Sequence, residues 1–141
     1  RRLLCPIKGQ ISSGRQINAE NLIKMNIKQL HNIVRKPWGK FYDFAESKEK
    51  WHLKALVIKK GHRLSLQKHA NRSEYWIVAE GKVKIQKGEK WRALTPQKTV
   101  FIKKRELHRL EALTNAVVIE VSFGKHEEDD IKRIADDYDR S

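Results

Sequence analysis

From Trp51 onward, apolar and polar residues alternate in short runs that are separated by turn-forming pieces. A period of two is typical of β-strands with one buried face, and the intervening KKG, AEG and QKGE segments favour tight turns. The runs are WHLKALVIK, RLSLQKH, EYWIVAE, KVKIQ, KWRAL, TVFIK, HRLEAL and AVVIEVSF. Short strands at nearly even spacing predict an all-β barrel or sandwich.

The regions flanking these runs follow a different pattern. Residues 1–24 include the polar run GQISSGRQ and have no periodicity, which indicates a loosely attached extension. We expect a short helix between Met25 and Val34, and another in EEDDIKRIADDY, where acidic residues suit a helix N-terminus. A chain of 141 residues has room for one full domain. The predicted organisation is an N-terminal extension over residues 1–34 and a single domain over residues 35–141.

The chain carries a formal net charge of +14, which attracts anions such as nucleic acid, acidic membranes or phosphorylated metabolites. It has no dense block of lysine and arginine, and no aromatic platform set in a basic strand, to favour nucleic acid. Apolar runs such as AVVI are far too short to span a membrane. Cys5 is the only cysteine, so nothing indicates an oxidising compartment. We therefore expect a cytoplasmic protein that binds neither nucleic acid nor membranes.

The stretch LSLQKHANRSEYW sets residues of metal-binding type among apolar ones. Gln67 and His69 are two residues apart, so on a strand their side chains point to the same face. Glu74 shares the face of Trp76 on the next run, where a buried carboxylate is costly unless it meets a cation. These three side chains make a partial coordination shell, to which His108 on a later run can add a fourth ligand.

A single histidine on a strand is more often structural than a ligand, and the spacing of the whole stretch changes that expectation. Gly61, Gln67, His69, Glu74 and Gly81 combine ligand types with turn glycines in one long pattern. This combination favours a divalent metal site over a set of isolated polar residues.

Four segments between Lys36 and Arg140 carry a resemblance to a known family. They are KPWGKFY, KKGHRLSLQKHANRSEYWIVAEGKVKI, LHRLEAL and EEDDIKRIADDYDR. This part of the chain resembles the cupin domain of type II phosphomannose isomerases, which also occurs as the C-terminal domain of bifunctional mannose-1-phosphate guanylyltransferases. The resemblance implies a double-stranded β-helix, or jelly-roll barrel, to which the expected short terminal helices would be added. It also implies a homodimer.

The resemblance implies a role for individual residues as well. In the family, the positions of Gln67, His69, Glu74 and His108 bind the metal, and the arginine at the position of Arg72, in the turn between the two runs, is implicated in catalysis. Zinc is the first choice of metal by resemblance, and this donor set also tolerates manganese, cobalt or iron. The implied reaction is the interconversion of mannose 6-phosphate and fructose 6-phosphate through an enediol, for which a metal would polarise the carbonyl.

Two further basic residues are candidates for binding the phosphate of the sugar, Lys54 and Arg109. Lys54 could also assist proton transfer, although a lysine on a strand is more often a solvated side chain, and strand alternation places Arg109 on the face opposite His108. The chain departs from the family pattern in several places: Arg105 replaces a glycine in the turn before His108, and Asp139 replaces one in the tail. Two other functions stay open: isomerisation or epimerisation of a different phosphorylated sugar, and a non-catalytic cupin that binds sugar or metal.

Overall fold

The structure, a computed structural model, describes residues 27–47 and 49–140. Within these ranges it is built almost entirely of β-strands. The strands are β1 (Ile27–Lys36), β2 (Gly39–Ser47), β3 (Trp51–Ile58), β4 (Leu66–His69), β5 (Arg72–Glu80), β6 (Val83–Lys87), β7 (Lys90–Leu94), β8 (Thr99–Ile102), β9 (His108–Ala112), β10 (Ala116–Gly124) and β11 (Ile131–Ala135). The expected all-β class is confirmed.

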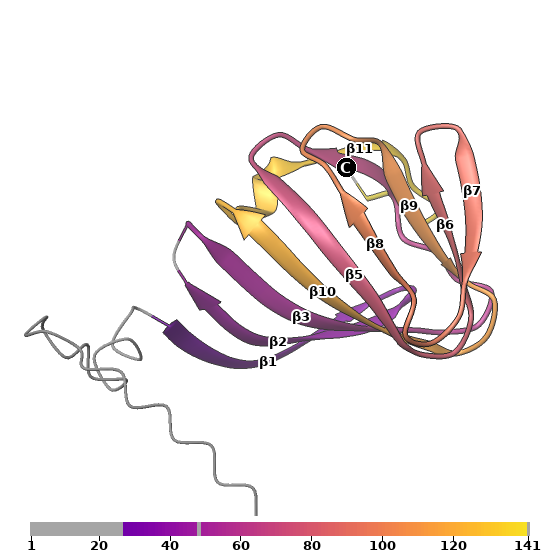
Figure 1. Cartoon of the computed structure of the whole chain (residues 1–141), viewed down its shortest axis with the longest axis horizontal. Coiled ribbons are helices and arrows are strands. Elements are labelled where there is room, and N and C mark those ends of the chain that lie inside the picture. The colour runs from indigo at the N-terminus through magenta and orange to yellow at the C-terminus, as the bar shows by residue number, and fades with distance from the viewer. Residues whose placement is uncertain (1–26, 48, 141) are drawn as a thin grey trace, which may run out of the picture.

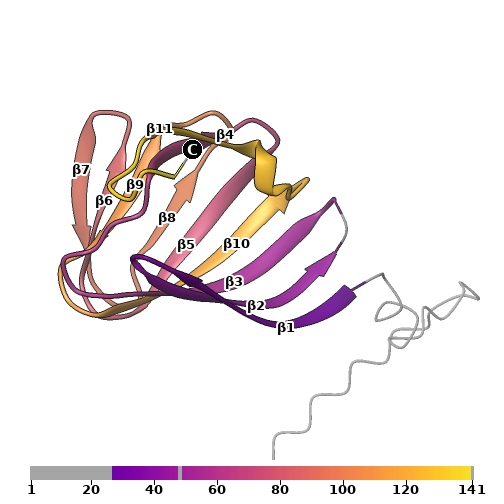
Figure 2. The ribbon, with the colours of Figure 1, turned by 180° about the vertical axis from the view of Figure 1, so that it is seen from behind.

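The strands form two antiparallel sheets that face each other (Figure 1). One sheet has six strands in the order β1-β2-β3-β10-β5-β8, and the other has five in the order β11-β4-β9-β6-β7. Figure 2 shows from behind how β4 and β11 close one side of the molecule. Because neighbours in each sheet come from distant parts of the sequence, residues far apart in the chain meet between the sheets.

The interior changes from polar to apolar along three adjacent strands. In β5 and β10 every second residue is buried from the first residue of the strand, as the alternating sequence predicts. From the polar end, the inward positions are Arg72, Glu74, Trp76 and Val78 on β5; Ser122, Glu120, Val118 and Ala116 on β10; His52, Lys54, Leu56 and Ile58 on β3. The apolar end forms the hydrophobic core, and the polar end lines a cavity with charged side chains.

Both expected helices are wrong. The described part of the first segment, from Ile27 on, belongs to β1, which pairs with β2 and runs across the predicted boundary between residues 34 and 35. In the C-terminal segment only a single 3-10 turn, Glu128–Asp130, precedes β11, which pairs with β4. In both places pairing with another strand, β2 for β1 and β4 for β11, satisfies the backbone in an extended conformation, so local helix signals do not decide the structure.

The expected extension over residues 1–24, with Met25 after it, lies outside the described residues. In the part of the chain that the structure describes, no helix is long and apolar enough to cross a membrane.

Candidate metal centre

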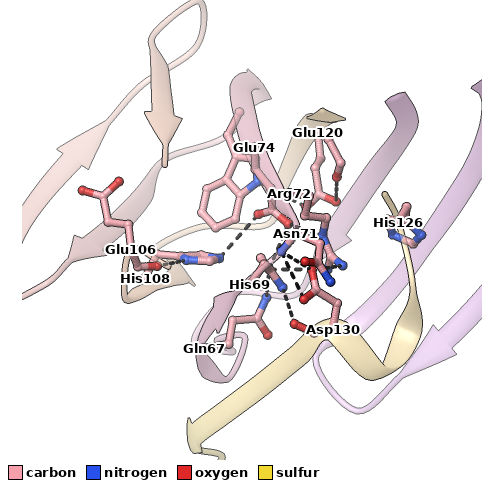
Figure 3. A network of polar contacts seen from close by, with 12 residues as sticks. Gln67, His69, Asn71, Arg72, Glu74, Glu106, His108, Glu120, His126 and Asp130 are labelled. Carbon is pink, nitrogen blue, oxygen red and sulfur yellow. Dashed lines mark hydrogen bonds and ion pairs between the residues drawn. The ribbon is translucent and has the colours of Figure 1, made fainter. Parts of the chain in front are cut away.

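The four predicted ligands come together between the two sheets (Figure 3). Gln67 and His69 lie on β4, Glu74 on β5 and His108 on β9, and Gln67 is the cross-strand partner of His108. Nε2 of His69 is 3.0 Å from Oε1 of Glu74, and Nε2 of His108 is 3.4 Å from Oε2. One ligand atom from each of these three residues lies within 4.8 Å of the others. His69, Glu74 and His108 are at most 2% exposed.

The other nitrogen of each imidazole is oriented by the backbone. Nδ1 of His108 is 2.8 Å from the carbonyl oxygen of Glu106, and Nδ1 of His69 is 3.4 Å from that of Asp130. A carbonyl only accepts hydrogen bonds, so each Nδ1 carries the proton that it donates. Both Nε2 atoms are thereby turned toward Glu74, as in histidines that bind metals through Nε2.

The geometry around Glu74 fits a cation. Oε2 of Glu74 and Nε2 of His108 are buried and have no hydrogen-bond partner among the described residues. Burial raises the pKa of Glu74, but the close approach of the His108 and His69 imidazoles outweighs it and holds that pKa well below its ordinary value. Burial lowers the pKa of His108, and the carboxylate of Glu74 more than reverses this, so the pKa is raised. Acceptors this close require a proton or a metal ion between them.

Gln67 lies beside this group, but its amide nitrogen faces the site. The nitrogen is 3.3 Å from Nε2 of His69, and the amide oxygen accepts a hydrogen bond of 2.6 Å from the hydroxyl of Ser65. The oxygen would face a cation after half a turn of the amide group. Two imidazoles, a carboxylate and an amide oxygen then form a set that suits zinc and tolerates other divalent ions.

Arg72 is the first residue of β5 rather than part of the preceding turn, and it is 3% exposed. Its guanidinium is a fixed fork: Nε donates to Oε1 of Glu74 at 3.2 Å, and Nη2 is 3.4 Å from Nε2 of His69. Nη1 donates to the carbonyl of Glu127 at 3.1 Å and lies 3.6 Å from a carboxylate oxygen of Asp130. Arg72 is thus held against the candidate metal ligands.

Asp130 connects the C-terminal segment to the turn between β4 and β5. Its carboxylate accepts hydrogen bonds from the backbone N–H groups of Ala70 and Asn71, at 3.0 and 3.2 Å. The acidic run that suggested a helix therefore caps a distant turn, and this contact fixes the spacing between His69 and Arg72.

A cavity of about 540 Å³, counted with its open mouth, borders the candidate metal centre. Gln67, Arg72 and Glu74 line one part of it. The remaining charged groups of the lining are Lys36, Lys54, Glu120, Arg133 and Arg140. Five cations face two carboxylates, so the cavity favours an anionic ligand.

Lys54 lies in this cavity, and its ammonium group is anchored. It donates a hydrogen bond of 3.0 Å to Nε2 of His126 and lies 4.6 Å from the centre of the Phe41 ring. Burial, together with the charges of Lys54 and Arg72, lowers the pKa of His126 to about 3, so this imidazole is a neutral acceptor. The contact with His126 has no signal in the sequence, because residues 54 and 126 are far apart.

Arg109 lies elsewhere. Strand alternation placed it on the face opposite His108, and it does not line the cavity. Its guanidinium donates to the carbonyl of Ala135 at 3.1 Å and lies 3.5 Å from Asp137. These contacts hold the C-terminal segment against β9.

Glu120 is the residue of this site that the sequence analysis missed. It is 7% exposed, and Trp76 donates its indole N–H to Oε2 at 3.1 Å. A signal was present: in AVVIEVSF the inward positions are Val118, Glu120 and Ser122, and a carboxylate in that phase has to be buried. Lys36, Arg133 and Arg140 had no such signal.

The backbone conformation at Arg105 and Asp139 explains why glycine is expected at these two positions. Arg105, in the turn that leads into His108, has φ 64°, and Asp139 has φ 53°. Both angles lie in the left-handed region, where glycine is unstrained and other residues, Asp less than most, are strained. The backbone N–H of Arg105 also donates to the carbonyl of His69 at 2.6 Å. The turn before His108 therefore adopts the left-handed conformation with arginine in place of glycine.

We expect Arg105→Gly to stabilise the protein. The left-handed conformation costs arginine about 1–2 kcal/mol, and the extra chain entropy of glycine takes back about 0.5–1 kcal/mol, leaving a net gain of roughly 0.5–1 kcal/mol. Asp139→Gly should gain less. Urea unfolding measures both changes, and a destabilised Arg105→Gly would show that the arginine side chain makes a contact worth more than the strain.

The chain is similar to known proteins in both sequence and fold. The family described as "Mannose-6-phosphate isomerase C-terminal" matches residues 24–136. Mannose-1-phosphate guanylyltransferase 2 of Escherichia coli O157:H7 is 37% identical over 111 residues, which cover 77% of this chain and 23% of that protein. Alginate biosynthesis protein AlgA of Pseudomonas aeruginosa is 36% identical over 116 residues, 80% of this chain and 24% of that protein. The chain thus spans about a quarter of the length of these relatives.

Solved structures share the fold at low sequence identity. An RmlC-like cupin from Shewanella frigidimarina superposes with a TM-score of 0.64 at 17% identity, over 74% of this chain and 98% of that one. The capsular polysaccharide assembling protein CapF from Staphylococcus aureus gives a TM-score of 0.65 at 16% identity, over 74% of this chain and 34% of that one. The fold is a cupin, and the chain belongs to the mannose-6-phosphate isomerase C-terminal family.

Proposed function

We propose that the chain is a metal-dependent isomerase that interconverts mannose 6-phosphate and fructose 6-phosphate. The observation that carries this proposal is that His69, Glu74 and His108 converge in a buried site beside a cavity rich in cations. Membership of the family supports the same substrate class.

The reaction moves a proton between C2 and C1 of the sugar while negative charge develops on an enediol oxygen. A divalent ion, zinc as first choice, held by His69, Glu74, His108 and a reoriented Gln67, would polarise the carbonyl group. Arg72 would stabilise the same developing charge, because its guanidinium is fixed in a water-poor site beside Glu74. An arginine stays protonated at neutral pH, so Arg72 is not assigned as the base.

The phosphate group would be bound by the cations of the cavity that lie away from the candidate ligands. Lys54 is anchored by His126 and presents a fixed charge, and Lys36 lies near the same Phe41 ring, with its nitrogen 5.9 Å from the ring centre. Arg133 and Arg140 line the side formed by the C-terminal segment. Arg109 has no part in this proposal, because it is outside the cavity.

We expect Lys54→Met to raise the KM for mannose 6-phosphate by about tenfold or more, the equivalent of roughly 1.4 kcal/mol, with little change in kcat. The reason is that a phosphate remote from C1 and C2 is bound equally in the ground state and the transition state. Steady-state kinetics measure the effect, with exposed Lys104→Met as the matched control. A fall in kcat at unchanged KM would instead place Lys54 at the reacting carbons.

The function is tested by isolating the protein, measuring its bound metal, and following fructose 6-phosphate formation from mannose 6-phosphate. Activity should disappear with a chelator and return with zinc, manganese, cobalt or iron. Mannose 1-phosphate and glucose 6-phosphate serve as alternative substrates. Conversion of another sugar phosphate in place of mannose 6-phosphate would move the proposal to an isomerase or epimerase of that sugar. Bound metal with no turnover of any of them would favour a non-catalytic cupin.

A further inference from the structure

Glu120 is a buried carboxylate in the cavity that the candidate metal centre does not use. It lies on β10, is 7% exposed, and lines the cavity together with Lys54, Arg72 and Glu74. The indole of Trp76 donates to one oxygen at 3.1 Å. The hydroxyl of Ser122 lies 3.4 Å from the other oxygen, to which it can donate. The side chain is therefore oriented by donors on both of its oxygens.

The strand register fixes the relation of Glu120 to the candidate metal ligands. Ser122 pairs with Glu74 and Glu120 pairs with Trp76, so Glu120 lies diagonally across from Glu74 on the same inward face. Diagonal neighbours of this kind are about 7–8 Å apart. Glu120 does not belong to the cluster of converging ligand atoms in the described chain. A small molecule bound in the cavity can therefore touch both the metal centre and Glu120.

The charges that face Glu120 come from each neighbouring strand. Lys54 on β3 is its cross-strand partner, Arg72 and Glu74 project from β5, and His108 projects from β9. Burial and then the negative charge of Glu74 raise the pKa of Glu120 to about 7, against the opposing charges of Lys54, Arg72 and His108. A buried carboxyl group that faces the cavity is placed to exchange a proton with a bound molecule, as general acid–base catalysis requires.

We propose that Glu120 is the catalytic residue that carries the proton between C2 and C1 of the bound sugar phosphate. This inference rests on the proposed isomerase function. Ionised Glu120 takes the proton from C2, the C–H electron pair forms the C1–C2 double bond, and the carbonyl electrons move to O1. The hydroxyl proton of O2 passes to O1 as C2 becomes the carbonyl carbon, and the double-bond electrons take the proton from Glu120 at C1. Glu120 ends ionised, and no other reactant is consumed.

A purely structural role for Glu120, as the partner of Trp76, predicts a different outcome from the same substitutions. Glu120→Gln keeps an oxygen that accepts the indole N–H but removes the group that exchanges a proton. Glu120→Asp keeps the proton-exchanging group on a shorter arm. A structural role therefore predicts damage to folding or metal content, whereas a catalytic role predicts loss of proton transfer alone.

The test uses the full chain loaded with zinc, in deuterated water, with deuterium at C1 and C2 followed by NMR. We expect Glu120→Gln to lower kcat at least 100-fold, in the range of lost acid–base catalysis, with unchanged zinc content by mass spectrometry and unchanged Tm. Glu120→Asp should regain part of the lost turnover. Exposed Glu89→Gln is the matched control.

The outcomes separate the two proposals. An inactive unsubstituted protein would overturn the isomerase function and this inference with it. An active unsubstituted protein beside a Glu120→Gln variant that keeps more than a tenth of the turnover would overturn the role of Glu120 alone. Loss of zinc or of folded protein in Glu120→Gln, with no turnover regained in Glu120→Asp, would assign Glu120 to the structure instead.

Discussion

Glu74→Gln is expected to lower the affinity for zinc by at least about 100-fold, because even partners of metal ligands are worth 10- to 100-fold and Glu74 is proposed as a ligand itself. Both of its oxygens face an imidazole nitrogen, at 3.0 and 3.4 Å, and among the described residues it is the carboxylate of this cluster. Turnover of mannose 6-phosphate should fall with the bound zinc. Competition with a zinc indicator measures the affinity.

The control for this change is Glu80→Gln, an exposed residue on the same strand. It should bind zinc like the unsubstituted protein. Circular dichroism would verify that both variants keep the fold, since glutamine has nearly the volume of glutamate. If Glu74→Gln bound zinc with unchanged affinity, the metal would lie elsewhere and the account of this site would be wrong.

Arg72→Lys is expected to lower kcat about 100- to 1,000-fold, the usual loss when one donor that stabilises an oxyanion is removed. Lysine keeps the charge but not the fork, and Arg72 uses all three nitrogens to contact Glu74, His69, Glu127 and Asp130. A single ammonium group cannot hold this geometry. Steady-state kinetics at saturating zinc measure the effect.

Exposed Arg92→Lys is the matched control for that substitution and should leave kcat unchanged. Zinc content decides how Arg72 acts. Full zinc occupancy with low kcat supports stabilisation of charge on the substrate, whereas loss of zinc would mean that Arg72 only orients Glu74 and His69. Full activity in Arg72→Lys would show that the Arg72 guanidinium does not stabilise the developing charge.

Strand alternation predicted much of the site, because it is a local property. Glu74 and Trp76 were expected on one inward face, and β5 buries both of them. Gln67 and His69 were expected on a shared face, and their side chains are in contact on β4. The same rule placed Arg109 away from His108. These expectations required only the period of a β-strand and no knowledge of which strands are neighbours.

The ends of the domain could not be predicted this way, because pairing with other strands decides their structure. The ladder of β1 with β2 shifts register between Gln29 and Asn32, and such an irregularity breaks the period of two in the sequence. In the acidic segment, Asp130 binds the turn between β4 and β5 instead of starting a helix. Local propensity favoured a helix in both segments, and tertiary contacts outweighed it.

The cavity itself was also beyond local reasoning. Lys36, Lys54, Glu120 and Arg140 come from four separate parts of the chain, and only the strand order brings them to one cavity. The anchoring of Lys54 by His126 spans 72 residues. Composition alone indicated an anionic ligand, and the fold shows where the positive charge is concentrated.

One divalent ion is expected between β4, β5 and β9. Crystals grown with zinc and measured on both sides of the zinc absorption edge would locate it. We expect one strong anomalous peak at about 2.0–2.2 Å from Nε2 of His69 and His108, the carboxylate of Glu74 and the side-chain oxygen of Gln67. A peak elsewhere, or a zinc-free cluster in which Glu74 contacts both imidazoles directly, would contradict it.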